Sequence, residues 1–206
     1  MVMTMVTKRR SNRETPRHLL QARIGHAALA LFRKSGFDSV SVDQIVAKAA
    51  VSKGAFFNFF PTKADALLVY FRELDGRIDK LRSRLDPTRP LATLEEFFVK
   101  AEAVLRGEGS LLDVLSRAIW SHPTLMKADR VSAKQDRRAF ADFFERARDA
   151  RAIAVEDPAV AADAVGDLWT GSILMWLAAG RSYSFAEAVN PKLRLLFTGL
   201  QPRRKK

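Results

Sequence analysis

The residues that could catalyse a reaction are few and scattered in this sequence. It contains no cysteine, and its only histidines are His18, His26 and His122. No phosphate-binding glycine loop and no group of carboxylates on one helical face accompanies them. His122 precedes Pro123, which is typical of a helix end rather than of a general base. The sequence therefore predicts a protein that is not an enzyme and that has neither a metal site nor a resident cofactor.

A different chemistry, the binding of a polyanion, is indicated by residues 53–63, KGAFFNFFPTK. Phe56 and Phe60 are four positions apart, so they share one face of a helix and are expected to pack inwards. Lys53 and Phe57 share another face, which could meet the major groove of DNA and its phosphates. The alternative is an ordinary core helix that happens to lie near the surface.

The charge of the chain is concentrated near its ends. The formal net charge is +12, and residues 1–63 hold 11 lysines and arginines against 3 acidic residues. The tail RRKK adds four cations, whereas residues 64–202 hold 20 basic and 20 acidic residues. This distribution is typical of a polyanion-binding module joined to a neutral body. Basic ends that only improve solubility are the alternative.

Composition also bears on where the protein works. The absence of cysteine fits a reducing cytoplasm. No segment is apolar over the roughly 18 residues that a membrane span requires, and the opening MVMTMV does not resemble a signal peptide. We expect a cytoplasmic protein with no membrane partner.

The spacing of apolar residues predicts an all-α fold of about nine helices and no strand. Gly36, Pro61 and residues 107–109 supply breaks between helices. Ser41 and Ser52 are suitable N-caps of two short helices joined by a tight turn, which is a helix-turn-helix. The pairs Thr62–Asp65, Thr93–Glu96 and Ser110–Asp113 are expected to open later helices. The helices are expected at about 19–35, 41–49, 52–60, 62–84, 93–106, 110–122, 123–153, 158–180 and 191–200.

Residues 24–67 resemble the DNA-binding domain of TetR-type bacterial transcriptional regulators. The shared features are the AAL-x-LF stretch, the Gly36-Phe37 turn, Ser41-Val42, Ile45, Val51-Ser52-x-Gly54, Phe60 and Lys63. Many spacings agree over about 45 residues, so the likeness is specific where a lone helix-turn-helix pattern would be weak. It implies four segments: a flexible basic arm (1–17), a helix-turn-helix domain (18–63), a helical ligand-binding and dimerisation domain (64–200) and a basic tail (201–206).

The resemblance, together with side-chain chemistry, predicts the DNA contacts. Lys53 could donate to phosphate or guanine, Ala55 could touch a thymine methyl group, and Asn58 could read adenine. Backbone N–H groups at Ser41 and Ser52 could face phosphates. The predicted DNA-binding residues are Ser41, Val42, Gln44, Ser52, Lys53, Gly54, Ala55, Phe57, Asn58, Phe59 and Lys63, of which Lys63 matches a phosphate-binding lysine of the family.

Three positions depart from the family pattern. Phe57 stands where the family usually has a phosphate-binding tyrosine, and Phe59 stands where histidine is frequent. Ala50 replaces the usual glycine of the turn. We expect the basic arm to offset part of the lost phosphate binding, so that deletion of residues 1–15 weakens binding to every DNA sequence and lowers its salt dependence.

The resemblance further implies that the last two helices form a homodimer interface and that the central helices enclose an effector pocket. Segment 158–180 is apolar nearly all round, which independently indicates burial on several sides. The expected interface residues are Val165, Ile173, Trp176, Leu193, Leu196 and Phe197. The expected pocket residues are Phe97, Phe98, Trp120, Phe140, Phe143, Phe144 and Trp169. Few charges lie within these stripes, so we expect an apolar or aromatic small-molecule effector.

These observations favour a homodimeric repressor that binds double-stranded DNA at a pseudo-palindromic operator and is released by its effector. An activator of the same family, or a protein that binds nucleic acid without sequence preference, is the alternative. A peripheral membrane protein is disfavoured because no helix combines a lysine-rich face with a long apolar one.

Overall fold

The computed structural model describes residues 16–199. Within this range the chain forms nine α-helices and one short 3-10 turn (Ala64–Ala66), and no strand, so the all-α prediction is confirmed. Most of the expected basic arm and the whole basic tail lie outside the described residues. The helices are α1 (Pro16–Ser35), α2 (Val42–Ala49), α3 (Lys53–Phe57), α4 (Leu67–Arg82), α5 (Pro90–Arg106), α6 (Ser110–Ser121), α7 (Pro123–Asp149), α8 (Pro158–Ala178) and α9 (Phe185–Thr198).

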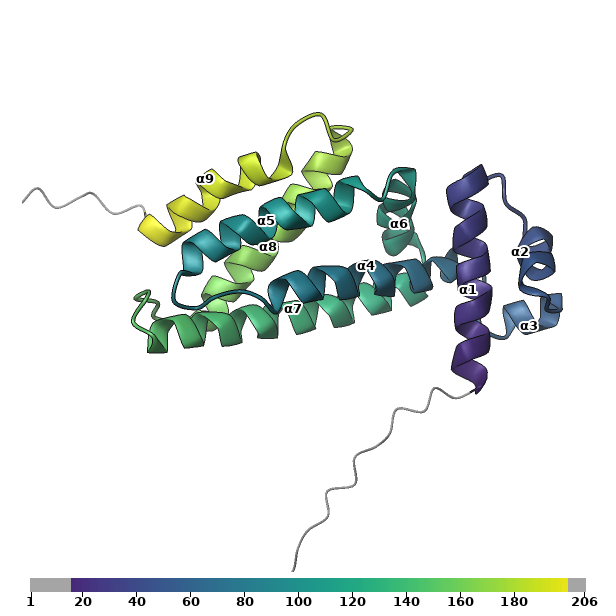
Figure 1. Ribbon diagram of the computed structural model, residues 1–206, viewed down its shortest axis with the longest axis horizontal. Helices are drawn as coiled ribbons and strands as arrows, with labels where there is room; N and C mark the ends of the chain where they lie inside the picture. Colours follow the sequence, from purple (N-terminus) through teal and green to yellow (C-terminus); the bar gives the residue numbers. More distant parts are fainter. Residues whose placement is uncertain (1–15, 200–206) are drawn as a thin grey trace, which may run out of the picture.

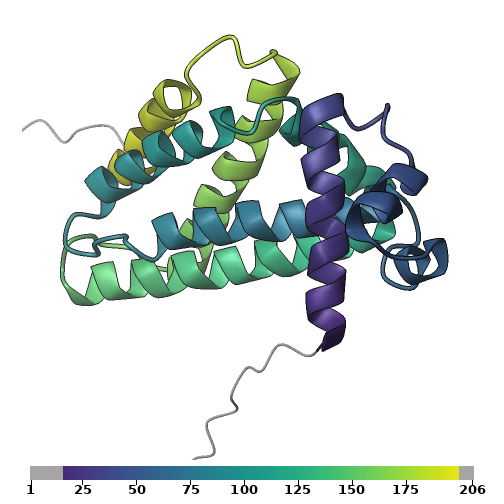
Figure 2. The ribbon, with the colours of Figure 1, turned by 45° about the vertical axis from the view of Figure 1, so that its right-hand side comes forward.

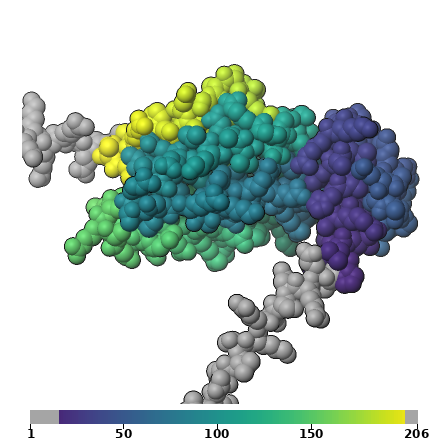
Figure 3. Space-filling model, in the orientation of Figure 1, coloured from purple at the N-terminus to yellow at the C-terminus, as the bar shows by residue number. Residues whose placement is uncertain are grey.

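The helices divide into a small group at one end of the molecule and a long bundle (Figures 1 and 2). Helices α1, α2 and α3 form the end group, and α1 runs across the start of α4. In the bundle, α7 packs along α4 and α8, and α5 packs along α9. The space-filling view shows the end group as a distinct lobe (Figure 3). This arrangement leaves α2 and α3 on the outside of the lobe, away from the bundle.

Several helix ends differ from the expected ones. Helix α5 begins at Pro90, because proline suits the first helical turn, and the hydroxyl of Thr93 instead accepts a hydrogen bond from the Asp86 N–H at 3.2 Å. Helix α9 begins after Ser184, whose hydroxyl caps Glu187, so Pro191 lies inside the helix rather than at its start. Helix α3 ends at Phe57, three residues before the expected end.

Two cores hold the structure together. In the end group, Ile24, Ile45, Phe56 and Phe60 are fully buried, which confirms the inward face expected for the two phenylalanines. In the bundle, an aromatic cluster joins α5, α8 and α9, with ring centroids 5.4–5.9 Å apart for successive neighbours. Its members are Phe97, Phe98, Trp169 and Phe185. Edge-to-face and tilted pairs of this kind stabilise a core beyond their area alone.

A close approach of α1 and α4 joins the two cores. Gly25 of α1 is buried, and a Cβ atom at this position would lie 2.2 Å from Cγ2 of Val69 in α4. No other residue type would fit there unless Val69 or one of the two helices shifted. The end group is therefore seated directly on the first turn of α4.

Candidate nucleic-acid interface and effector cavity

Helix α2 starts with a complete capping box. The hydroxyl of Ser41 accepts a hydrogen bond from the Gln44 N–H at 3.2 Å, and Oε1 of Gln44 accepts one from the Ser41 N–H at 2.8 Å. Both side chains thereby satisfy backbone groups that the helix end would leave without partners. The N–H groups of Ser41 and Gln44 are thereby engaged within the helix end, and the contact of other first-turn N–H groups with phosphate stays a prediction.

The turn between α2 and α3 places Ala50 in the left-handed conformation, with φ of 50° and ψ of 54°. Its N–H bonds to the Ala47 carbonyl at 3.2 Å, and the Val51 N–H bonds to the Val46 carbonyl at 3.0 Å. Glycine adopts this conformation freely, whereas an L side chain adds strain of about 1 kcal/mol. The alanine that departs from the family pattern therefore retains the turn at a modest cost in stability.

Helix α3 presents its polar end and one aromatic ring to solvent. The Ser52 hydroxyl accepts a hydrogen bond from the Ala55 N–H at 3.1 Å, as expected of an N-cap. Gly54 and Asn58 are exposed, and Ala55 is half-buried. Phe57 is 49% exposed, although its ring packs edge-to-face on Phe56. The part of the Phe57 ring that does not contact Phe56 is available to an outside surface.

Lys53 has a partner that the sequence did not reveal. Its ammonium lies 2.7 Å from Oδ1 of Asp43 in α2, and both side chains are exposed. The pair connects the two helices of the motif across their outer face. An exposed pair of this kind adds little stability, so its main effect is to orient the lysine.

Lys63 makes internal contacts that the sequence did not reveal. Its ammonium donates to the carbonyls of Phe37 at 2.8 Å and Val40 at 2.9 Å, and it lies 4.3 Å from the centre of the Phe37 ring. In the free chain the ammonium is therefore held by internal contacts, and the phosphate contact expected of Lys63 stays a prediction. Because loop carbonyls between α1 and α2 lack helical partners, the lysine satisfies them and fixes the loop.

Arg17 contacts the ring of Phe59 at the surface of the end group. Phe59 is half-buried, and the guanidinium of Arg17, at the start of α1, lies 5.6 Å from the centre of its ring. Phe59 therefore lies at the boundary between the core of the end group and its surface, with its ring in cation–π contact with Arg17. Arg17 was not among the predicted contact residues, and only the folding of α1 beside α3 brings it there. Val42, the remaining predicted contact, is half-buried at the start of α2.

A cavity of about 200 Å³ lies in the bundle, where α4, α6, α7 and α8 meet. Its walls are mostly apolar, with Phe71, Ile119, Ile173 and Leu174 among them. Trp120 and Trp169 line it, as expected. The polar lining residues are Asp75, Ser116, Asp129, Ser132, Asp136 and Thr170. We call this space the central cavity.

The five expected pocket phenylalanines do not line the central cavity. Phe97, Phe98 and Phe140 are buried in the core, with the first two packed behind Trp169. Phe143 lines a different groove, and Phe144 packs on Phe197 of α9 at 6.2 Å. The helical spacing identified these residues as buried, but it could not say whether a buried face meets another side chain or empty space.

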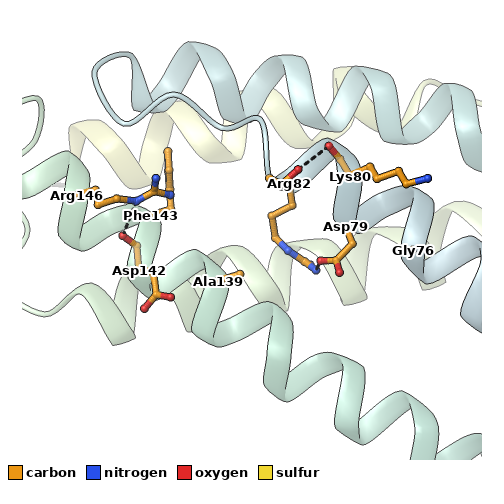
Figure 4. A pocket seen from close by; sticks show the side chains of 9 residues that line it. Gly76, Asp79, Lys80, Arg82, Ala139, Asp142, Phe143 and Arg146 are labelled. Atoms are coloured by element: carbon orange, nitrogen blue, oxygen red, sulfur yellow. Dashed lines mark hydrogen bonds and ion pairs between the residues drawn. The ribbon is translucent and has the colours of Figure 1, made fainter. Parts of the chain in front are cut away.

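The groove lined by Phe143 is larger and charged. It has a volume of about 650 Å³ and lies between α4 and α7. Figure 4 shows Asp79, Lys80 and Arg82 of α4 on one side and Asp142 and Arg146 of α7 on the other. We call it the charged groove.

Comparison with known proteins agrees with the helix-turn-helix geometry. Residues 24–69 match the family model described as bacterial regulatory proteins, tetR family. The HTH-type transcriptional repressor KstR of Rhodococcus jostii is 26% identical over 158 residues, which cover 75% of this chain and 71% of KstR. The transcriptional regulator AcuR of Cereibacter sphaeroides is 29% identical over 176 residues, covering 79% of this chain and 80% of AcuR.

A solved structure extends the likeness to both groups of helices. FadR of Thermus thermophilus, a TetR-family transcriptional repressor in complex with lauroyl-CoA, has a TM-score of 0.68 and 27% identity, covering 90% of this chain and 97% of FadR. A putative TetR-family regulator from Syntrophomonas wolfei has a TM-score of 0.69 at 18% identity, which shows the shared fold. Residues 24–69 carry the DNA-binding helix-turn-helix of the TetR family. The chain is a transcriptional regulator, similar over most of its length to KstR, AcuR and FadR.

Helices α8 and α9 expose other apolar residues than those expected to form the dimer interface. Val165, Trp176 and Leu193 are at most 1% exposed, so they fill the core of a single chain. Ile173 faces the central cavity, and Phe197 is half-buried against Phe144. Only Leu196 of the expected interface is exposed. The large apolar side chains that α8 and α9 do present to solvent are Val160, Leu174, Met175, Leu195 and Leu196.

Residues 16–199 contain neither a membrane-spanning helix nor a metal-binding cluster. Across those residues, no helix has the length and apolarity needed to cross a membrane. The same part of the chain has no group of histidines and carboxylates arranged to hold a metal ion.

Proposed function

We propose that the protein is a homodimeric repressor, which binds a pseudo-palindromic operator and is released from it by a small ligand in the central cavity. In this proposal residues 18–63 are the DNA-binding domain and residues 64–200 bind the ligand and the second subunit. The protein acts on chromosomal DNA in the cytoplasm. The relatives KstR and FadR are named as repressors, which supports this direction of control.

The observation that carries the proposal is that one helix serves both sites. Helix α4 follows the helix-turn-helix after a single 3-10 turn, and its middle lines the central cavity with Phe71, Asp75 and Ile78. Its first turn contacts α1 at Val69, where Gly25 leaves no spare room. A ligand that shifts α4 must therefore also shift α1 and the helices packed on it.

An ionic cluster strengthens this connection. Glu108, in the turn between α5 and α6, lies 2.5 Å from the guanidinium of Arg77 in α4 and 3.9 Å from that of Arg33 in α1. Its side chain is nearly buried, so these charges are weakly screened. Burial and the charge of Glu108 raise the pKa of Tyr70 in α4, which stays neutral. Through Glu108, the turn between α5 and α6 is connected both to α1 of the end group and to α4 of the bundle.

The ligand selects between two arrangements of the dimer. Without it, the two α3 helices have a spacing that suits successive major grooves. With it, the chain favours an arrangement in which that spacing is wrong. The shift is limited by the ratio of ligand affinities for the two states, so a hundred-fold preference changes the equilibrium by about 2.7 kcal/mol.

The decisive experiment measures binding to the region upstream of the protein's own gene against random duplex of equal length, at several salt concentrations. We expect a preference of about a thousand-fold or more and a footprint with two half-sites. Equal affinity for both duplexes, with a steep salt dependence, would instead favour a protein that binds nucleic acid without sequence preference.

A reporter gene behind the bound operator separates repression from activation. We expect deletion of the regulator to raise transcription. A fall in transcription on deletion would identify an activator that uses the same DNA site.

A further inference from the structure

The central cavity combines apolar walls with acidic side chains. Asp75 of α4 and Asp129 and Asp136 of α7 all line it. No lysine, arginine or histidine is among its lining residues in the described part of the chain. The earlier expectation of a purely apolar or aromatic ligand rested on few charges near the core, and these three carboxylates contradict its premise.

Asp136 receives its counter-charge from outside the cavity. Its Oδ1 lies 2.5 Å from Nη1 of Arg82. Arg82 is buried, pairs also with Asp79, and lines the charged groove (Figure 4) rather than the central cavity. The guanidinium therefore supplies a counter-charge for Asp136 without lining the central cavity. Asp75 and Asp129 do not share this counter-charge through an ion pair.

Neither Asp75 nor Asp129 forms an ion pair with a cation among the described residues. Asp75 accepts one hydrogen bond, from the Ser132 hydroxyl at 2.5 Å. Asp129 has neither a hydrogen bond nor an ion pair within residues 16–199. Asp75 and Asp129 line the same cavity, and burial together with the charge of Asp75 raises the pKa of Asp129. Both residues are half-buried. Negative charge partly removed from water without a counter-charge is unfavourable, and a positively charged ligand would remove that cost.

Aromatic rings supply the second element of a cation site. Trp169 is half-buried with its ring anchored on Phe97 and Phe98, and it borders the cavity. Trp120 also borders it and is nevertheless 63% exposed. An indole held at the edge of a cavity is free to contact a ligand, and tryptophan is the strongest of the side chains in cation–π contacts.

We propose that the central cavity binds an amphipathic organic cation, with its ammonium group beside Asp75 and Asp129 and its apolar body against Trp169, Ile173 and Leu174. This assignment rests on the proposed function in one respect, since it names the class of ligand that would control DNA binding. The binding itself can be measured without DNA.

Two isosteric probes test the charge directly. Benzyltrimethylammonium and neopentylbenzene have nearly the same shape and differ in one positive charge. Binding can be followed through tryptophan fluorescence, because two of the three tryptophans line the cavity, and by calorimetry. We expect the cation to bind at least ten-fold more tightly than the hydrocarbon. Equal affinities, or tighter binding of the neutral probe, would overturn the proposal.

Matched variants locate the charge. Asp129→Asn and Asp75→Asn are each expected to weaken binding of benzyltrimethylammonium by about ten-fold, with neopentylbenzene unaffected. The control is Asp142→Asn, an exposed carboxylate of α7 that lines the charged groove instead. Loss of the cation preference in the control, or its retention in both cavity variants, would contradict the assignment. Thermal unfolding of each variant excludes misfolding as the cause, and the comparison of probes on the unaltered protein needs no variant.

Operator release separates this inference from the proposed function. Lauroyl-CoA is the third ligand, because the FadR relative was solved in complex with it. Tight binding of the cation without operator release would support the ligand class and contradict ligand control of DNA binding. Release by lauroyl-CoA, with no binding of the cation, would support ligand control and overturn the cation proposal.

Discussion

Single residues on the outer face of α2 and α3 determine how the motif can meet DNA. Lys53, Phe57 and Asn58 are exposed there, whereas Lys63 is committed to loop carbonyls and Ser41 to its capping box. We propose that Lys53, Phe57 and Asn58 are the side chains of this face that contact DNA. The Lys53–Asp43 pair provides its clearest charged feature.

Replacement of Lys53 by alanine should weaken operator binding about ten-fold, or about 1.4 kcal/mol, because one phosphate or guanine contact is lost and Asp43 is left facing the DNA. The slope of log affinity against log salt should fall by about one. Fluorescence anisotropy at several salt concentrations measures both. Lys100→Ala, at an exposed lysine of α5 paired with Glu96, is the control and should change neither. An unchanged slope for Lys53→Ala would place this lysine away from the DNA.

Asp136 should make stability depend on pH. Burial raises its pKa to about 6, against the attraction of Arg82 and with added repulsion from Asp75 and Asp79. The folded chain thus holds this proton more tightly than the unfolded chain, whose aspartate has a pKa of 3.8. The resulting stabilisation is complete below the unfolded pKa and is lost as pH rises through about 6.

We expect Asp136→Asn to flatten this dependence. Between pH 4 and pH 7 the unaltered protein should lose about 1–3 kcal/mol more in its free energy of unfolding than the variant does. Urea unfolding at both pH values provides the measurement, with Asp142→Asn as the exposed control on the same helix. Parallel pH profiles for Asp136→Asn and the unaltered protein would show that this carboxyl group is not perturbed.

At the scale of helices, the contact of α1 with α4 decides how the two domains move together. Gly25 allows the backbones to approach closely, and Glu108 adds charged contacts with both helices. A glycine inside a helix normally costs about 1 kcal/mol relative to alanine. Its presence in α1 is explained by the side chain of Val69, which occupies the space of a Cβ atom.

Gly25→Ala should therefore destabilise the protein by about 1–3 kcal/mol, although alanine is the better helix former. Adding Val69→Ala should restore part of the loss. The matched control is Gly76→Ala in α4, where a Cβ atom meets nothing within 4 Å and a gain of up to about 1 kcal/mol is expected. Thermal unfolding checks all three variants. Equal effects at the two glycines would mean that α1 and α4 are not tightly packed.

For the whole molecule, the exposed apolar side chains of α8 and α9 are the surface on which dimerisation would depend. Met175 is 67% exposed and Leu174 is 40% exposed, next to the exposed Gly171 on the same helix. Leu195 and Leu196 continue the apolar surface on α9. A second subunit placed there would remove these side chains from water, with about 25 cal/mol gained for each Å² of apolar surface buried.

Met175→Glu should convert the dimer into a monomer, as sedimentation would measure, and operator affinity should fall by at least a hundred-fold because two half-sites are no longer bound together. Val131→Glu, at an exposed valine of α7, is the control. Circular dichroism should show unchanged helix content in both. A dimer that survives Met175→Glu would place the subunit interface elsewhere.

The amino-acid sequence by itself determined the helical class, the helix-turn-helix and the inward face of Phe56 and Phe60, because these depend on periodicity and on breaks between neighbours in the chain. It also identified Trp120 and Trp169 as cavity residues. Tertiary structure alone decided that Phe97 and Phe98 pack behind Trp169, that Trp176 and Leu193 belong to the core of one chain, and that Lys63 turns inwards. It also brought Asp75 and Asp129 together from different helices. A helical pattern tells which side of a helix is buried, whereas the partner of that side depends on contacts between residues far apart in the chain.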